Sequence, residues 1–331
     1  VPGDRPVLLC SEADTRQVLK QSPDPGDCER RLGCWAFDPA NRKLYLRTST
    51  GLAPDRHVIE ISHEPWGLMI RGGSDPKAVP RHIVVRGLVL KNYANAGLRA
   101  NYAEDLLIED CQVLQSGYGL ELWYSSRTTV RRCEAWANYF QRHTEAAGIM
   151  FHGTSRNSLA TNNYVHDSPQ DGIRAYGGEG SKGTRFVRNL VVNTRAPMYF
   201  KGGGTLGVPD KNVVVGGQNF GRAVSNPPAD GANTIVGVVG LLNTSARDLI
   251  VPRGEQARAR FADPAYHDYR LQSDSPYRAR GSESIGAFPY EAVVFYVGPE
   301  GSDTNAGTSA REPWRTLSRA ARELTPGQSL Y

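Results

Sequence analysis

The sequence predicts an all-β fold, a right-handed parallel β-helix, for most of its 331 residues. Short apolar stretches recur every 22 to 29 residues between about residues 82 and 215, each leads into a turn with a second apolar stretch, and no helical pattern intervenes. Each such repeat is one coil, which buries its inner face only by stacking on its neighbours. A leucine-rich repeat is the alternative, but its L-x-x-L-x-L-x-x-N signature is absent.

The first strands of the coils align into columns of similar residues. We predict that two columns point inward, Val85, Ile108, Val130, Leu159 and Phe186 in one and Leu90, Val113, Ala135, Tyr164 and Val191 in the other. A third column between them holds Leu88, Cys111, Cys133, Asn162 and Asn189. It predicts two stacked buried thiols, and a turn in which Asn162 and Asn189 share amide hydrogen bonds.

The second strand of each coil alternates between apolar and polar residues. Alternate residues of a strand point to opposite faces, so the apolar ones point inward. We call the outward residues the groove stripe, and we expect it to be exposed. Its first column is Arg99, Glu121, Met150, Arg174 and Tyr199, and its second is Asn101, Trp123, His152, Tyr176 and Lys201.

The flanks differ from the repeat. Residues 1–80 are predicted to be an irregular β region, 81–290 the coils and a final irregular coil, and 291–331 a strand, a loop and a short amphipathic capping helix. In the first region, Ala36–Arg47 predicts a strand, an Asp-Pro turn and a strand, and Cys28 and Cys34 could form a disulfide in an oxidising compartment.

The predicted capping helix spans residues 309–327 and has an apolar stripe of Trp314, Leu317, Ala321 and Leu324. We expect it to cover an open end of a solenoid, either its own or that of a neighbouring molecule, in which case the chain self-associates.

Composition excludes several classes of function. The formal charge of +5 is dispersed without a basic run, which argues against nucleic-acid binding. No apolar run approaches the roughly 18 residues of a membrane span. The five cysteines lack zinc spacing, and the chain begins at Val1 without a signal peptide, as a trimmed product would.

Three sets of motifs resemble secreted right-handed parallel β-helix proteins of the polysaccharide lyase and glycoside hydrolase type. The opening segment of that family is similar to residues 296–308, followed by 313–321, its central coils to 143–149 and 162–173, and its final coil to 263–287. The resemblance implies a secreted, carbohydrate-active protein. Because the opening segment stands at the C-terminal end here, we consider a tandem array, a circular permutation or a cap donated to a neighbour.

The groove stripe has residue types that suit an acidic polysaccharide. Elimination at a uronic acid needs a cation at the carboxylate, a base for the C5 proton and an acid for the leaving oxygen. We predict a polysaccharide lyase with catalytic residues His152, Arg174, Tyr176, Lys201 and Glu145, and with substrate-binding residues Arg99, Glu121, Trp123, Tyr199 and Asp171. Calcium is the candidate cofactor implied by the resemblance, with no ligand set identified.

Two other functions remain open. A glycoside hydrolase needs two carboxylates about 5 to 9.5 Å apart, for which the candidates are Glu121, Glu145, Asp167 and Asp171. A non-catalytic filament module is the other alternative. In purely structural roles, Asp167 and Asp171 would cap turns, and Glu121 would pair with Arg99 or Arg174.

Overall fold

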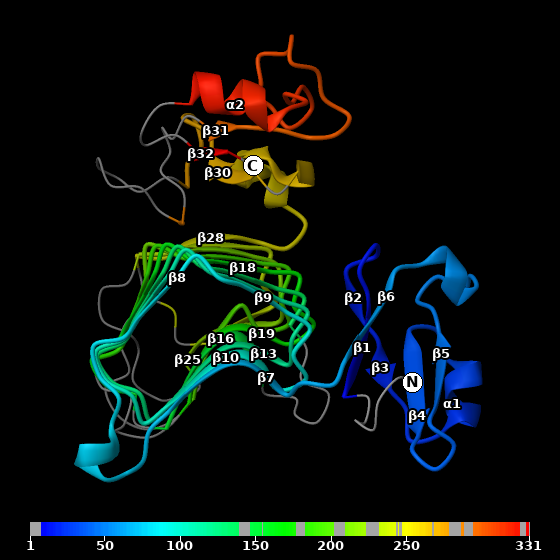
Figure 1. Ribbon diagram of the computed structural model, residues 1–331. Helices are drawn as coiled ribbons and strands as arrows, with labels where there is room; N and C mark the ends of the chain where they lie inside the picture. The colour runs from blue at the N-terminus through cyan, green and yellow to red at the C-terminus, as the bar shows by residue number, and fades with distance from the viewer. Residues whose placement is uncertain are drawn as a thin grey trace.

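The structure is a computed structural model. It describes residues 8–138, 146–153, 155–176, 183–201, 209–222, 232–242, 244, 247–266, 268–277, 286–287, 294–324 and 329–330. A parallel β-helix forms the centre of the molecule, with a small N-terminal β subdomain beside it and a C-terminal segment over one of its faces (Figure 1). The predicted solenoid fold is confirmed. No helix in the described ranges has the length and apolar character needed to cross a membrane.

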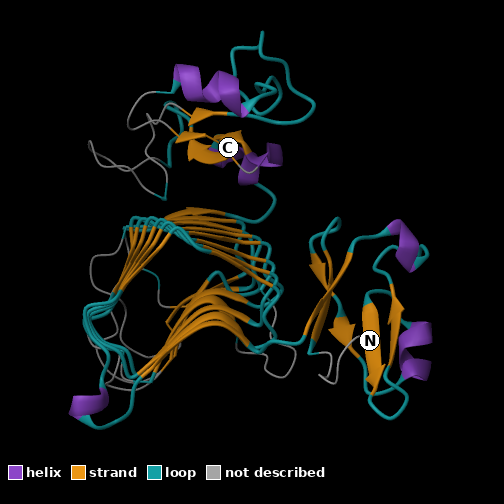
Figure 2. Ribbon diagram, viewed as in Figure 1, coloured by secondary structure: helices purple, strands orange, loops and turns teal. Residues whose placement is uncertain are grey.

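Three parallel sheets form the walls of the solenoid (Figure 2). Sheet I contains β7 (Trp66–Arg71), β10 (Ala96–Asn101), β13 (Tyr118–Trp123), β16 (Ala147–His152), β19 (Asp171–Tyr176), β22 (Met198–Lys201), β25 (Asn219–Arg222) and β27 (Gly240–Leu242). Sheet II contains β8 (Val84–Arg86), β11 (Leu107–Glu109), β14 (Thr129–Arg131), β17 (Leu159–Thr161), β20 (Arg185–Val187) and β23 (Pro209–Asp210). Sheet III contains β9 (Val89–Lys91), β12 (Gln112–Leu114), β15 (Glu134–Trp136), β18 (Tyr164–His166), β21 (Leu190–Val192), β24 (Val213–Val215), β26 (Thr234–Val236) and β28 (Leu249–Val251).

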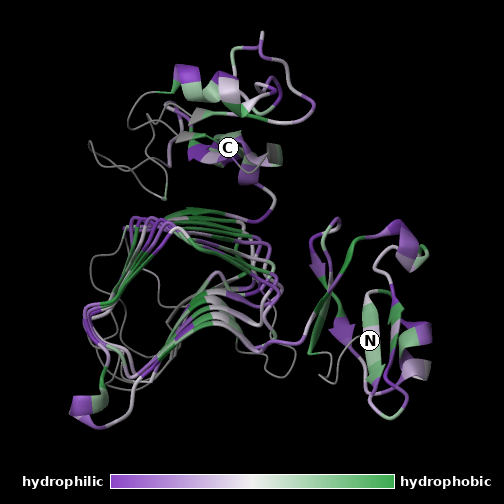
Figure 3. Cartoon of the chain, in the orientation of Figure 1, coloured by the Kyte–Doolittle hydropathy of each residue, from purple (hydrophilic) through white to green (hydrophobic). Residues whose placement is uncertain are grey.

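The core lies between the three sheets, where the strands are hydrophobic and the corners largely hydrophilic (Figure 3). The predicted columns are correct for the first three coils and wrong by one residue in the fourth. There Val130 pairs with Ala160 instead of Leu159, and Ala135 pairs with Val165 instead of Tyr164. Ala160 and Val165 are fully buried, so a small residue fills the space predicted for leucine.

The same correction applies to the buried asparagines. The ladder runs through Asn163, Asn189, Asn212 and Asn233, and excludes Asn162. Each of the first three amides donates from Nδ2 to Oδ1 of the next asparagine, at 2.9 to 3.0 Å, and Asn233 donates to Asp248 at 2.8 Å. Cys111 and Cys133 occupy the same turn in earlier coils as buried free thiols, as predicted.

The bend between sheets II and III has the same form in six coils. Only two residues separate the strands, and the first has a positive φ of 50° to 68°: Gly87, Asp110, Arg132, Asn162, Arg188 and Lys211. Asn162 therefore occupies the left-handed position, which asparagine tolerates better than most residues. The next residue, Asn163, points into the ladder.

The N-terminal subdomain is built from short strands around a small core. Its elements are β1 (Leu9–Glu12), β2 (Gln17–Val18), β3 (Lys20–Gln21), α1 (Pro25–Arg30), β4 (Cys34–Asp38), β5 (Lys43–Arg47), η1 (Pro54–Arg56) and β6 (Ile59–Ser62). The predicted hairpin is confirmed as the antiparallel pair β4 and β5. Cys28 and Cys34 are buried free thiols packed with Ala36, so the disulfide is not formed in this structure. A 3-10 turn, η2 (Pro76–Ala78), follows β7.

The C-terminal segment packs on the outer face of sheet III. It contains η4 (Gln256–Ala259), β29 (Phe261–Asp263), η5 (Pro264–Tyr266), β30 (Asp268–Leu271), β31 (Val294–Phe295), α2 (Leu317–Glu323) and β32 (Ser329–Leu330). Phe261 and Tyr269 of the β29–β30 hairpin cover outward residues of β18, β21 and β24. Helix α2 is shorter than predicted, and its buried residue is Ala320, whereas Leu317 is 67% exposed.

Trp314 is buried, as expected, but by its own segment. Its ring stacks on Phe295 at 4.7 Å and lies against Gly307, where a Cβ atom would be 2.4 Å from it. The segment reaches the β29–β30 hairpin through Tyr296, whose hydroxyl donates to Asp268 at 2.9 Å, and through the Arg311–Asp263 pair at 3.0 Å. Capping of a solenoid end by this segment stays a prediction.

Glu109 on sheet II gives the first testable prediction. Three arginines, Arg86, Arg131 and Arg132, donate to its carboxylate, and they lower its pKa to about 2. A lowered pKa stabilises the fold above the unfolded-state value, and that contribution disappears as the pH falls through about 2. We expect Glu109→Gln to lower the melting temperature most at pH 5 to 7 and least near pH 2. Thermal melts across pH, with Glu312→Gln as the exposed control, test this; an equal effect at all pH values would contradict it.

Candidate functional site

The groove stripe forms the predicted ladder on the outer face of sheet I. Arg99 pairs in register with Glu121, Glu121 with Met150, Met150 with Arg174 and Arg174 with Tyr199. The second column runs from Asn101 through Trp123, His152 and Tyr176 to Lys201. Parallel pairing therefore places residues of five coils side by side, at the strand spacing of about 4.8 Å.

Glu121 is the most perturbed group in the stripe. Its side chain is only 3% exposed, although it points away from the core. Burial raises the pKa of this carboxyl to about 7, against the opposing effect of Arg99, whose Nη1 lies 3.4 Å from Oε2. Oε2 accepts no hydrogen bond from the residues that the structure describes. Near pH 7 the group is therefore suited both to donate and to accept a proton.

Arg99 is held between two tryptophans. Its guanidinium carbon lies 5.0 Å from the ring centre of Trp66 and 4.7 Å from that of Trp123, and Nε donates to Asn101 at 2.8 Å. Trp123 in turn contacts the His152 ring edge-on at 4.5 Å. Aromatic rings and a fixed guanidinium are the groups that bind sugar rings and their carboxylates.

Arg174 is fixed by a different set of contacts. It forms an ion pair with Asp171, which also accepts from Arg195 at 2.7 Å, and its guanidinium lies 5.0 Å from the Tyr199 ring centre. Arg174 is 2% exposed and Asp171 is fully buried. Asp171 therefore orients the two arginines and is itself shielded from solvent.

The structure corrects two expectations about the stripe. Its first column is not uniformly exposed, since Glu121, Met150 and Arg174 are buried. Asp167 lies away from the stripe, just beyond β18 of sheet III, where it bonds to His166 and Asn193. The predicted pairing of Glu121 with Arg99 is confirmed.

Three predicted residues are placed in part or not at all. Glu145 lies outside the described residues. The backbones of Tyr176 and Lys201 are in register with His152, but their side chains are outside the described set.

The first strand of the ladder was not among the strands predicted from the sequence. β7 pairs with β10, which brings Trp66 and Met69 into the site. The alternation in Trp66–Arg71 matches that of the later strands and could have identified it. Just beyond the strand ends, a cavity of about 500 Å³ is lined by Tyr102, Tyr124 and Arg156, among others. The two tyrosine rings stack at 4.9 Å, so the aromatic ladder continues around the corner.

The described residues of the site supply groups for acid–base chemistry, and they do not form a metal-binding cluster. Of the described residues, no group of three or more His, Cys, Asp or Glu is placed to hold a metal ion. Glu121, Arg99, His152 and Arg174 together supply a proton-transfer group, cations and an imidazole on neighbouring coils.

Comparison with known proteins supports the fold of this region. A family model described as a right handed beta helix region matches residues 60–218. A search of curated proteins finds no match. Among solved structures, the crystal structure of pectate lyase Pel9A aligns with 14% identity and a TM-score of 0.39, over 62% of this chain and 70% of that chain. The family match spans β6 to β24 and thus the whole groove stripe.

Proposed function

We propose that the protein binds an acidic polysaccharide along the groove stripe and cleaves it by β-elimination. The observation that carries this proposal is Glu121, a buried carboxyl with a pKa of about 7 beside a guanidinium. A buried group with a pKa near the working pH is typical of an acid or base in catalysis. Its neighbours are aromatic and cationic, as a uronic-acid chain requires.

Substrate binding would use the ladder in the direction of the solenoid axis. Trp66, Trp123 and Tyr199 supply stacking surfaces on different coils, and Arg99 and Arg174 supply cations between them. Tyr176 and Lys201 follow His152 in the second column and would extend the site to further sugar units. A polymer of this kind occurs outside cells, so we propose that the protein acts there.

The reaction assigns each group one role. An arginine of the stripe pairs with the uronate carboxylate and makes the C5 proton more acidic. His152 takes that proton, the C4–O bond breaks, and protonated Glu121 gives its proton to the leaving oxygen. The product carries a double bond between C4 and C5. His152 and Glu121 lie on adjacent strands two residues apart, on the order of 8 Å between Cα atoms, which leaves room for a sugar ring.

Hydrolysis is the second candidate, and the described carboxylates favour it less. Asp171 is engaged by Arg174 and Arg195, whereas Oε2 of Glu121, at an outward position of sheet I, accepts no hydrogen bond from the described residues. A hydrolase needs a second one, for which Glu145 remains the candidate.

A product assay separates the reactions. We expect polygalacturonate, alginate or another uronate polymer to give reducing ends together with absorbance at 235 nm. Reducing ends without absorbance would indicate hydrolysis, and neither signal together with no retardation in affinity electrophoresis would reject the proposal. Parallel assays with added calcium and with EDTA test whether calcium, the candidate cofactor implied by the family resemblance, is needed.

A further inference from the structure

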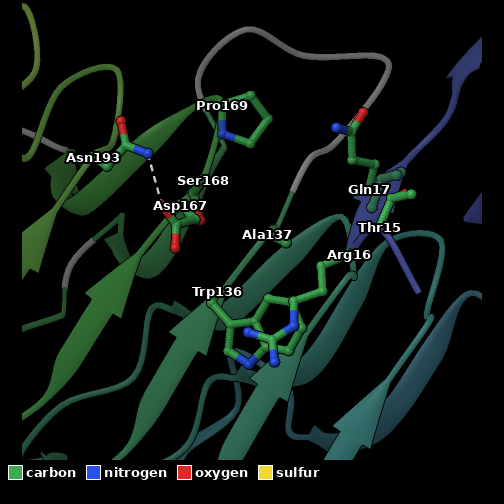
Figure 4. Close-up of a pocket in the computed structure, with 10 residues that line it drawn as sticks. Thr15, Arg16, Gln17, Trp136, Ala137, Asp167, Ser168, Pro169 and Asn193 are labelled. Carbon is green, nitrogen blue, oxygen red and sulfur yellow. Dashed lines mark hydrogen bonds between the residues drawn. The ribbon is translucent and has the colours of Figure 1, made fainter. Parts of the chain in front are cut away.

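A second cleft lies between the N-terminal subdomain and the solenoid (Figure 4). The β1–β2 turn forms one wall, and the residues that follow β15, β18 and β21 of sheet III form the other. Its volume is about 590 Å³, within the range of sites for small ligands. It is distinct from the groove stripe, which lies on sheet I.

Arg16 supplies an unpaired positive charge to this cleft. Its guanidinium lies 5.3 Å from the ring centre of Trp136, and none of the described carboxylates is its partner. The residue is exposed and has a φ of 57°, because it forms the tight turn between β1 and β2. Stacking on Trp136 fixes the guanidinium, so less side-chain entropy is lost when it binds an anion.

The opposite wall holds polar groups in fixed positions. Asp167 accepts from Asn193 Nδ2 at 2.7 Å, and its other oxygen bonds to His166 Nδ1 at 2.8 Å. The second ring nitrogen of His166 lies 3.0 Å from Glu134, and the ring stacks on Trp136 at 6.0 Å. His166 is 5% exposed and lies beside Trp136 on the neighbouring strand, so it holds both Trp136 and Asp167 in place.

We infer that this cleft is a second saccharide site, which binds a uronate unit with its carboxylate on Arg16 and its hydroxyls on Asp167 and Asn193. The edge of Trp136 would contact the sugar ring. The choice of a uronate rests on the proposed function, whereas the anion preference rests on Arg16 itself. Because the two walls belong to different parts of the chain, a ligand here would also bind the subdomain to the coils.

Binding measurements test the site in a background with strongly reduced turnover. Isothermal titration of Glu121→Gln with trigalacturonate is expected to show binding at two sites. Arg16→Gln should weaken one of them roughly ten- to a hundredfold, as loss of a charged hydrogen bond would, and leave binding at the groove stripe unchanged. Asn193→Asp should also weaken it, since it adds a negative charge, and aspartate tolerates the φ of 51° at this position. Lys20→Ala, an exposed cation of the same subdomain, is the control.

The possible outcomes test this binding site separately from the proposed lyase activity. If Arg16→Gln and Asn193→Asp bind as tightly as the control, or if neutral galactotriose binds as well as the acid, the inference is wrong. If trigalacturonate does not bind at all, it is also wrong. If Arg16-dependent binding is present while the wild type shows no product at 235 nm with any polymer, the cleft is retained and the lyase proposal fails.

Discussion

Replacing Glu121 with glutamine is expected to reduce turnover at pH 7 by about 10²- to 10⁴-fold, the usual contribution of one general acid or base. Glutamine has nearly the same shape and stays beside Arg99, but it cannot transfer a proton. The Michaelis constant should change much less. Initial rates at 235 nm measure the effect, with Glu312→Gln as the exposed control; a loss of less than tenfold would remove Glu121 from the proposed mechanism.

The same variant has a distinct stability signature. The pKa of Glu121 is raised to about 7 in the fold, above the ordinary value of 4.5. Its contribution to stability is therefore complete below pH 4.5 and is lost as the pH rises through 7, by up to about 3 kcal/mol. Glu121→Gln lacks this loss, so it should gain stability relative to the wild type between pH 5 and 8. Denaturant unfolding at both pH values tests this, and a constant difference would show that the carboxyl does not titrate in this range.

Among the proposed substitutions, Asn189→Ala is expected to cause the largest loss of folding stability. The Asn189 side chain accepts from Asn163 N and Nδ2, and it donates to Ala160 O and Asn212 Oδ1. Its removal leaves buried polar groups unsatisfied, at roughly 1 to 3 kcal/mol each before relaxation, so we expect a loss of about 3 to 5 kcal/mol.

Asn162→Ala is the matched control for this experiment. It removes the asparagine that the sequence analysis placed in the ladder, and it should cost only about 1 kcal/mol for a non-glycine residue with positive φ. Chemical denaturation of both variants measures the difference. Equal losses would mean that the ladder contributes nothing specific.

The register of the fold was predictable wherever one residue type fitted each column. Val85, Ile108 and Val130 are equivalent in the sequence and in the sheet. The fourth coil failed because two adjacent asparagines, Asn162 and Asn163, each fit one role of the bend. Asparagine is suited both to a left-handed φ and to an amide ladder, so composition could not choose between them.

The candidate site was predictable as a set of columns, but not in its burial. Alternation along a strand assigns faces, and it cannot show that Glu121 and Arg174 are covered on an outer face. The second cleft was beyond sequence reasoning, because Arg16 and Trp136 are distant in the chain and belong to different structural units. Likewise, the helical period in the C-terminal segment suggested that Leu317 is buried together with Trp314. Leu317 is exposed, and Trp314 is covered by Phe295 and Gly307 of its own segment.

The two-residue bend between sheets II and III sets the register of the strands in each coil. This bend has two residues in six coils, whereas the other two corners differ in length from coil to coil. One extra residue in the bend would shift the register of the strand that follows it. Those corners border the groove stripe and the second cleft. Evolution or protein engineering can therefore vary the ligand-facing loops of individual coils while the register of the strands stays the same.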